Sequence, residues 1–262
     1  MVDSKQEVLS KIDEREVIEL TKQIIRIPST NPPGKQQDIS DFLAGQLRDL
    51  GLRVSTPTKE VEKPNVIGTV KGKGPKLLFC GHMDTAPVTE KERAFWTVDP
   101  FEGVVKKGKI YGRGAVDMKG GIVSILSAAK AISQAKVVLE RDLMVAFFVD
   151  EEAGGMEAGS MYLTKSGFMN DVIAALDPEP SDMQVRYMFK GRTIYEIAVT
   201  GKSAHSSSPE KAVNAVSKMG KVIVSLDSTK VSIEPHSILG PCTRSFTAIE
   251  ARQFLAIFFW LT

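Results

Sequence analysis

Residues 77–85 read Leu77-Leu78-Phe79-Cys80-Gly81-His82-Met83-Asp84-Thr85, and this stretch decides how the rest of the chain is interpreted. An apolar run of strand length ends at a glycine, and a histidine and an aspartate follow two positions apart. In an extended chain, residues i and i+2 point to the same side, so His82 and Asp84 can lie side by side at the edge of a buried sheet. A metal-bound histidine usually has a carboxylate or carbonyl partner that fixes its tautomer. Taken alone, however, the pair is better explained as a strand end with a satisfied polar pair.

The chain around this stretch alternates short apolar runs with segments of helical periodicity. Helical spacing of apolar residues predicts helices over 14–27, 37–50, 122–132 and 156–166. Apolar runs of strand length predict strands over 52–55, 65–70, 77–80, 143–149 and 172–176. A loop that can wall a site is expected over 87–105. Because several strands are continuously apolar and alternate with helices, we expect an α/β fold with a parallel or mixed sheet covered by helices on both faces.

The pattern changes after about Met183. Residues 184–189 and 193–200 predict a pair of strands, followed by a loop over 201–209 and a helix over 210–226. We therefore expect two domains, a catalytic metal-binding domain over 1–183 and a smaller, partial α+β domain over 184–262.

The composition is that of an ordinary globular protein, with 262 residues, 42% hydrophobic and 25% charged, and a net charge of +2. This balance gives no electrostatic reason to expect binding to nucleic acid or to a membrane surface. Cys80 and Cys242 alone do not make a disulfide framework. Residues 1–15 are polar and have no apolar core of a secretory signal, so a cytoplasmic location is expected. The apolar run 254–261 is too short to span a membrane; it predicts a segment docked in a core, or the product of a truncated or frame-shifted reading.

Four places in the sequence carry polar residues at or near the carboxyl ends of predicted strands, where open α/β sheets place their sites. They are His82 with Asp84, Asp117 in a glycine-rich turn, Glu151 with Glu152, and Asp177 with Glu179. One histidine with several carboxylates suits zinc, cobalt or manganese, and a glutamate beside a ligand can act as general base. Each acidic cluster taken singly also fits a solvated loop or a helix N-terminus. The glycines over 112–121 do not match a phosphate-binding loop.

Several consecutive motifs resemble those of one metallopeptidase family, that of acetylornithine deacetylase, succinyl-diaminopimelate desuccinylase, aminoacylase and glutamate carboxypeptidase. The motifs that carry the resemblance are Gly81-His82-Met83-Asp84-Thr85, Gly112-Arg113-Gly114-Ala115-Val116-Asp117-Met118-Lys119-Gly120-Gly121, Asp150-Glu151-Glu152, Glu179-Pro180-Ser181 and Gly201-Lys202-Ser203-Ala204-His205-Ser206-Ser207. The resemblance runs from the N-terminal helix to about Thr243. It implies a phosphorylase/hydrolase-like mixed sheet with helices on both faces, plus a partial α+β lid, or dimerisation, domain.

The resemblance also implies a role for each matching residue. His82 and Glu179 would bind a first metal ion, Glu152 a second, and Asp117 would bridge the two. Asp84 would orient His82, Glu151 would act as general base, and His205 would stabilise the oxyanion, in dimeric members at the partner's site. The cofactor implied is one or two Zn²⁺ ions, with Co²⁺ or Mn²⁺ as substitutes. The implied substrates are N-acyl amino acids or small peptides, and a homodimer would form through the lid.

One ligand assignment is open in the sequence. Counting forward from the strand over 172–176 selects Asp177, whereas counting back from Lys190-Gly191, which resembles the family's entry to the next strand, selects Glu179. The tripeptide Glu179-Pro180-Ser181 matches the family motif and favours Glu179.

The sequence departs from the family pattern at its C-terminal end. No histidine follows His236, so the family's final histidine ligand to the second metal has no counterpart, and the chain looks C-terminally truncated after the first part of the lid. The first site keeps His82, Asp117 and Glu179, while the second keeps only Asp117 and Glu152. Two functions therefore stay open: a metal-dependent hydrolase with a weakened second site, and an inactive remnant that only binds metal or dimerises.

Overall fold

In a computed structural model, the apolar run Leu143–Phe148 forms β6, the central strand of a five-stranded sheet. The structure describes residues 4–154, 156–205, 207–230 and 233–250. The chain divides into two compact units, residues 1–184 and 185–262. The apolar run at 254–261 lies outside the described residues.

The sheet of the first unit has the strand order β1-β2-β6-β3-β7. Its strands are β1 (Arg53–Ser55), β2 (Val66–Val70), β3 (Lys76–His82), β6 (Leu143–Phe148) and β7 (Val172–Leu176). The pairs β1–β2 and β2–β6 are antiparallel, whereas β3 runs parallel to both β6 and β7. Parallel strands end at the same edge of a sheet, so the chain segments that follow β3, β6 and β7 start together. That edge carries the polar residues singled out in the sequence.

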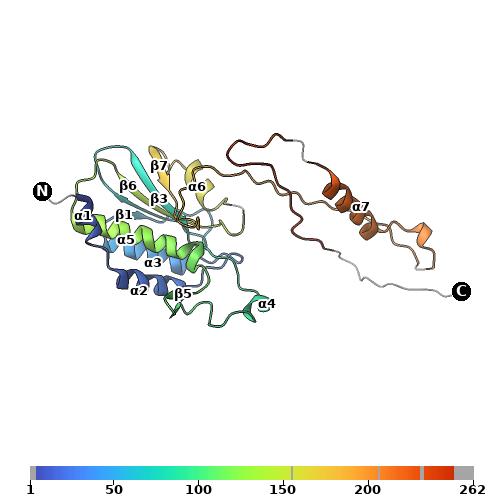
Figure 1. Cartoon of the computed structure of the whole chain (residues 1–262), viewed down its shortest axis with the longest axis horizontal. Helices are drawn as coiled ribbons and strands as arrows, with labels where there is room; N and C mark the ends of the chain where they lie inside the picture. Colours follow the sequence, from blue (N-terminus) through green and yellow to red (C-terminus); the bar gives the residue numbers. More distant parts are fainter. Residues whose placement is uncertain (1–3, 155, 206, 231–232, 251–262) are drawn as a thin grey trace. The chain divides into compact units, whose positions relative to one another are not determined.

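Helices cover both faces of this sheet (Figure 1). They are α2 (Glu14–Ile25), α3 (Gln37–Asp49), α5 (Gly120–Ala135) and α6 (Ser160–Lys165), and α1 (Ser4–Leu9) contacts α5. On one face α2, α3 and α5 pack on Val145 and Phe147 of β6, and on the other face Leu163 of α6 packs on Met144 and Ala146. Alternate side chains of β6 thus pack into two separate cores, one on each face of the sheet. This confirms the predicted mixed α/β sheet with helices on both faces.

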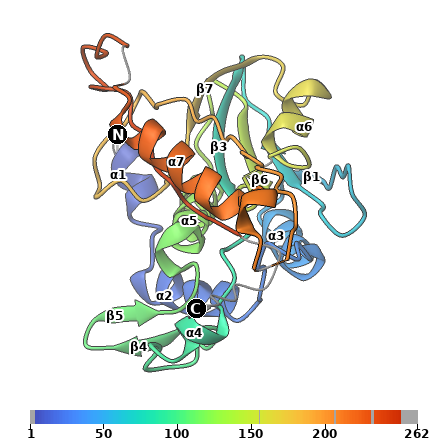
Figure 2. The same ribbon diagram turned by 90° about the vertical axis from the view of Figure 1, so that its right-hand side faces the viewer.

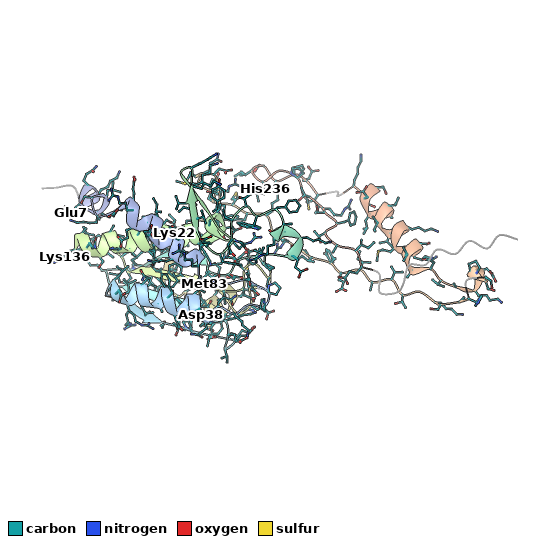
Figure 3. All side chains as sticks on the ribbon, turned by 90° about the horizontal axis from the view of Figure 1, so that it is seen from below. Glu7, Lys22, Asp38, Met83, Lys136 and His236 are labelled. Atoms are coloured by element: carbon teal, nitrogen blue, oxygen red, sulfur yellow. The ribbon has the colours of Figure 1, made fainter. Side chains whose placement is uncertain are left out.

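The larger core includes the helix faces expected from their periodicity. Ile24 of α2, Ile39 of α3 and Ile122 of α5 are fully buried in it together with Met83. Figure 3 shows Met83 between the helices that carry Lys22 and Asp38. Helix α2 begins at an Asp13 side chain that accepts hydrogen bonds from two backbone N–H groups, which stabilises its first turn.

The segment predicted as a loop over 87–105 contains short elements. They are α4 (Glu90–Arg93) and β4 (Val104–Lys106), which pairs with β5 (Lys109–Tyr111). Helix α4 starts with a capping box formed by Thr89 and Glu92. The hairpin and α4 lie on the side of the unit where α2 lies (Figure 2), and Arg26, just after α2, donates a hydrogen bond to the Glu102 carbonyl.

The strand β7 forms one edge of the sheet, and among the described residues it pairs only with β3. Its side chains are largely exposed: 54% of the surface of Ile173 and 54% of that of Leu176 are accessible to solvent. The edge strand on the opposite side, β1, is short and polar.

The second unit differs from the sequence prediction. The predicted strands over 184–189 and 193–200 are not formed; described residues 185–250 contain no strand ladder, only isolated bridges between Lys202 and Val213 and between His236 and Gly240. A strand requires a hydrogen-bonded neighbour, which these segments lack. The helix predicted over 210–226 is α7 (Ala215–Ser228), which begins later because Asn214 caps its first turn; residues Pro209–Lys211 form a separate 3₁₀ turn. In the first unit the predicted helix over 156–166 is likewise shorter, as α6.

Candidate metal centre

His82 ends β3 in the interior of the first unit, with 1% of its surface exposed. Its Nδ1 atom lies 3.0 Å from the backbone carbonyl of Asp84. A carbonyl oxygen only accepts hydrogen bonds, so Nδ1 carries the hydrogen, and Nε2 is the atom left to bind something else. A backbone carbonyl that fixes the tautomer is the arrangement that metal-binding histidines commonly show.

Two carboxylates face Nε2 of His82. The Oδ1 atom of Asp117 lies 3.0 Å away and Oε1 of Glu179 lies 3.2 Å away. One ligand atom from each of these residues lies within 4.8 Å of the others, which suits a shared cation. The three residues come from the end of β3, the turn before α5 and the loop after β7, all at the same edge of the sheet.

The charge of this cluster favours a cation between the three groups. Burial alone would lower the pKa of His82, but the carboxylates of Asp84 and Glu179 outweigh it and raise the pKa to about 11. The carboxylates therefore stabilise positive charge strongly at the imidazole. A nitrogen and two carboxylate oxygens form a donor set suited to zinc, cobalt or manganese.

Asp84 is completely buried and holds several backbone and side-chain groups together. Its Oδ1 lies 3.6 Å from Nδ1 of His82 and accepts the backbone N–H of Glu151 at 3.3 Å. Its Oδ2 accepts the backbone N–H of Glu152 at 3.1 Å and the Asn31 amide at 2.9 Å. Burial by itself would raise the pKa of Asp84, yet the adjacent His82 imidazole and the hydrogen bond from Asn31 lower it. Asp84 thus stays ionised and aligns the ends of β3 and β6.

The two adjacent glutamates after β6 differ in their contacts. Glu152 accepts a hydrogen bond from the Ala86 backbone at 2.9 Å, whereas no protein hydrogen bond to the Glu151 carboxylate is present in the described part of the chain. Burial, with the neighbouring carboxylates, raises the pKa of both groups. A half-buried carboxylate with a raised pKa and no bonded partner suits an exchange of protons.

Glu152 and Asp117 also line a cavity of about 260 Å³ beside the cluster, together with Trp96 and Arg113. The Arg113 guanidinium lies 5.7 Å from the centre of the Trp96 ring and forms an ion pair with Glu92 of α4. The cavity is large enough for a small acyl group or an amino-acid side chain. Glu152 and Asp117, the two residues of the predicted second site, both line this cavity, and no histidine among the described residues lines it.

Glu179, and not Asp177, lies against Nε2 of His82. Asp177 is not part of that group, and burial with the neighbouring Glu179 raises its pKa to about 6. Close packing fixes this loop. A side chain on Gly121, in the first turn of α5, would place its Cβ 2.6 Å from the carbonyl oxygen of Pro178.

The remaining histidines belong to the second unit. His205 is exposed, and its Nδ1 lies 2.7 Å from Ser207 Oγ. The exposed His236 accepts hydrogen bonds from the backbone of Ile238 and Leu239 through Nδ1. The proposed role of His205 at an oxyanion stays a prediction.

Sequence reasoning missed three residues that support the site. Asn31 bonds Asp84, Lys63 bonds Asp150 next to the glutamate pair, and buried Lys119 donates hydrogen bonds to the carbonyls of Ile24 and Ile27. Burial lowers the pKa of Lys119 to about 7. Their only sequence signal was a polar residue inside a turn or loop motif, which is also typical of exposed positions.

A mixed α/β sheet with a histidine and carboxylates gathered at the ends of its parallel strands defines a class of proteins built to hold a cation. A family model described as Peptidase family M20/M25/M40 matches residues 78–258. Because the match covers more than half of the sequence, the chain belongs to this peptidase family.

Individual relatives agree with this assignment. The chain is 29% identical to the N-formyl-4-amino-5-aminomethyl-2-methylpyrimidine deformylase of Bacillus subtilis, over 95% of the chain and 65% of the relative. It is 34% identical to the acetylornithine deacetylase of Proteus mirabilis, over 81% of the chain and 55% of the relative. The chain thus spans about half to two thirds of the length of these curated relatives.

Solved structures share the fold. Human carnosine dipeptidase 1 matches 66% of this chain and 40% of its own, with a TM-score of 0.57 and 24% identity. A tripeptidase from Staphylococcus aureus matches 82% of this chain and 57% of its own, with a TM-score of 0.55 and 18% identity.

Proposed function

We propose that this protein is a metal-dependent hydrolase that cleaves the amide bond of N-acyl amino acids or small peptides. The observation that carries the proposal is the convergence of Asp117 and Glu179 on Nε2 of His82, with Nδ1 held by a backbone carbonyl. The names of the relatives support the reaction type, since a deformylase and a deacetylase remove acyl groups and a dipeptidase cleaves peptide bonds.

His82, Asp117 and Glu179 would hold the first ion, and Asp117 with Glu152 a second, with Zn²⁺ as the ion and Co²⁺ or Mn²⁺ as substitutes. A bound divalent ion supplies Lewis-acid polarisation of a carbonyl and lowers the pKa of water. Asp84 keeps His82 in the tautomer that leaves Nε2 free for binding. The cavity beside Asp117 and Glu152 offers room for one side of the scissile bond.

Glu151 is the proposed general base. It accepts the proton of the attacking water and delivers that proton to the leaving amine. Its raised pKa, caused by burial and the neighbouring carboxylates, makes it a stronger base than an exposed glutamate. In the second unit, we propose His205 as the group that stabilises the oxyanion, and residues 184–262 as part of a lid through which a homodimer forms.

The described part of the chain has no helix with the length and apolar character needed to cross a bilayer. We propose that the protein acts in the cytoplasm on small molecules, with neither nucleic acid nor membrane as partner.

The test is hydrolysis of a panel of N-formyl, N-acetyl and N-succinyl amino acids and dipeptides. The metal-free protein is assayed with Zn²⁺, Co²⁺ or Mn²⁺ added, beside His82→Ala. We expect turnover that depends on the added metal and is lost in the variant. Metal binding without turnover of any substrate would contradict the proposed hydrolase. It would favour the alternative, an inactive protein that only binds metal or dimerises. That alternative rests on the absence of a further histidine near Glu152 among the described residues.

A further inference from the structure

Asn31 lies between two buried carboxylates of the first unit. Its Nδ2 atom donates to Oδ2 of Asp84 at 2.9 Å and to Oδ1 of Asp150 at 3.2 Å. An amide NH₂ group carries two hydrogens, so one is available for each carboxylate. Only 2% of Asn31 is exposed, so water cannot readily replace these bonds.

Lys63 completes the far end of this arrangement. Its Nζ lies 3.0 Å from the same Oδ1 of Asp150 and 3.2 Å from Glu60. The other oxygen of Asp150 accepts the backbone N–H of Ala158. Two buried anions close together repel each other strongly unless donors and a cation compensate them. Asn31 supplies the donors between them and Lys63 supplies the charge.

Asp84 passes this positioning on to the metal centre. It touches Nδ1 of His82 and accepts the backbone N–H groups of Glu151 and Glu152. A shift of the Asp84 carboxylate would therefore move the imidazole of one ligand and the backbone of the proposed base together.

The backbone around Asn31 is built for this role. Its N–H donates to the carbonyl of Thr85 at 2.9 Å, so Asn31 is fixed to the residue that follows Asp84. Gly34 has φ +81°, and a Cβ there would lie 2.8 Å from Cε of Lys63 and 2.9 Å from Oδ1 of Asn31. The turn thus leaves the space that the lysine and asparagine side chains occupy.

We infer that Asn31, with Asp150 and Lys63, forms a positioning network that holds Asp84, and through it the metal ligand His82 and the backbone of Glu151, in place. The inference rests on the proposed metal-dependent function. Asn31, Asp150 and Lys63 themselves lie outside the group of three metal-binding side chains; they act through Asp84.

The experiment compares two buried asparagines. Asn65 is fully buried in the same unit but bonds the carbonyls of Pro57 and Ala158 and the N–H of Val149, with no carboxylate among its partners. Asn31→Ala and Asn65→Ala are titrated with Co²⁺, following visible absorption, and unfolded in urea. We expect both to lower the urea midpoint. Only Asn31→Ala should weaken cobalt binding, by about 10- to 100-fold, and alter the absorption bands.

A second pair of variants tests the charge. Lys63→Met leaves the Asp150 carboxylate without its cation and is expected to weaken cobalt binding. The added change Asp150→Asn removes the uncompensated charge and should restore a large part of the affinity. Because the Lys63 side chain is 18% exposed, this test holds even where Asn31→Ala does not fold.

The outcomes separate the two proposals. If the unmodified protein binds cobalt and His82→Ala does not, but Asn31→Ala and Lys63→Met bind it as the unmodified protein does, the positioning network is refuted and the proposed metal centre stands. An equal loss of cobalt affinity in Asn31→Ala and Asn65→Ala would also refute the network. If the unmodified protein binds no cobalt, the proposed function fails, and the network inferred from it fails too.

Discussion

At the scale of single residues, the adjacent Glu151 and Glu152 illustrate how one dipeptide can serve two purposes. Their backbone N–H groups share Asp84 as acceptor, yet the Glu152 carboxylate is held by the Ala86 backbone and the Glu151 carboxylate is not. A held carboxylate suits ion binding and an unheld one suits proton transfer. The difference between the two gives a direct test.

The change Glu151→Gln keeps the size of the side chain and removes its basic oxygen. We expect kcat to fall by about 10²- to 10⁴-fold, the usual contribution of a general base, with unchanged metal content. Steady-state kinetics and elemental analysis measure the two quantities. A matching loss of metal would show instead that Glu151 is a ligand.

Asp142 provides a residue-scale prediction that is independent of the metal centre. Its buried carboxylate accepts hydrogen bonds from Lys71 at 2.8 Å and from the Gly72 N–H at 2.9 Å, and these lower its pKa below the ordinary value. A depressed folded-state pKa stabilises the protein above the unfolded-state pKa, near 3.9, and this stability is lost as the pH falls through the lower folded-state value.

We therefore expect Asp142→Asn to lower the urea midpoint at pH 7, with a smaller difference from the unmodified protein at pH 3. Midpoints measured by circular dichroism at pH 7, 5 and 3 check this. A difference that stays constant across the series would mean that the ionisation of Asp142 contributes nothing.

At the scale of elements, the first turn of α5 and the loop after β7 fit closely. The Pro178 carbonyl occupies the space beside Gly121, and the same loop carries Glu179. The position of Glu179, a proposed metal ligand in the loop after β7, therefore depends on a helix that starts more than 50 residues earlier in the chain. Backbone atoms form the contact, so a side chain at Gly121 cannot be accommodated by a rotamer change.

The change Gly121→Ala is expected to lower the free energy of unfolding by about 1–3 kcal/mol, the usual effect of overpacking, and to weaken metal binding. Gly45→Ala is the control, because its Cβ meets nothing within 4 Å in the middle of α3. That change should instead stabilise the protein by about 0.5–1 kcal/mol, since alanine favours helix over glycine. Urea unfolding and cobalt titration of both variants measure the contrast. If Gly121→Ala and Gly45→Ala changed the free energy of unfolding and the cobalt affinity equally, the predicted contact between Gly121 and the Pro178 loop would be contradicted.

The elements also show what the sequence could predict. Hydrophobic periodicity was sufficient to predict β3, β6 and the long helices, because an element that is buried on one or both sides has apolar residues at a characteristic spacing. It failed over residues 184–200, where alternation alone could not show that a strand lacks a neighbour. It could not reveal Asn31 or Lys63, whose bonds to Asp150 join residues 119 and 87 positions apart. The tripeptide Glu179-Pro180-Ser181 favoured Glu179 over Asp177 through its resemblance to a family motif, but counting from the neighbouring strands left the choice open, because the contact of Glu179 with His82 depends on the packing of the loop.

At the scale of the whole molecule, ligand binding and folding are coupled. A divalent ion that binds only the folded protein stabilises it by RT ln(1 + [ion]/Kd), about 2.7 kcal/mol at 100 times Kd. For a unit of this size we expect the unfolding temperature to rise by roughly 5–10 °C. Differential scanning calorimetry with and without Zn²⁺ measures the shift, and His82→Ala should show none. An equal rise in that variant would place the ion elsewhere.

The exposed edge strand β7 has a practical consequence. Its outer backbone groups form no ladder with another described strand, and Ile173 and Leu176 remain in water. An edge of this kind is a template for strand addition, so concentrated solutions should aggregate, more steeply as salt screens the surface charges. Placing a lysine at position 173 would give purified protein a longer shelf life without altering the sheet behind it.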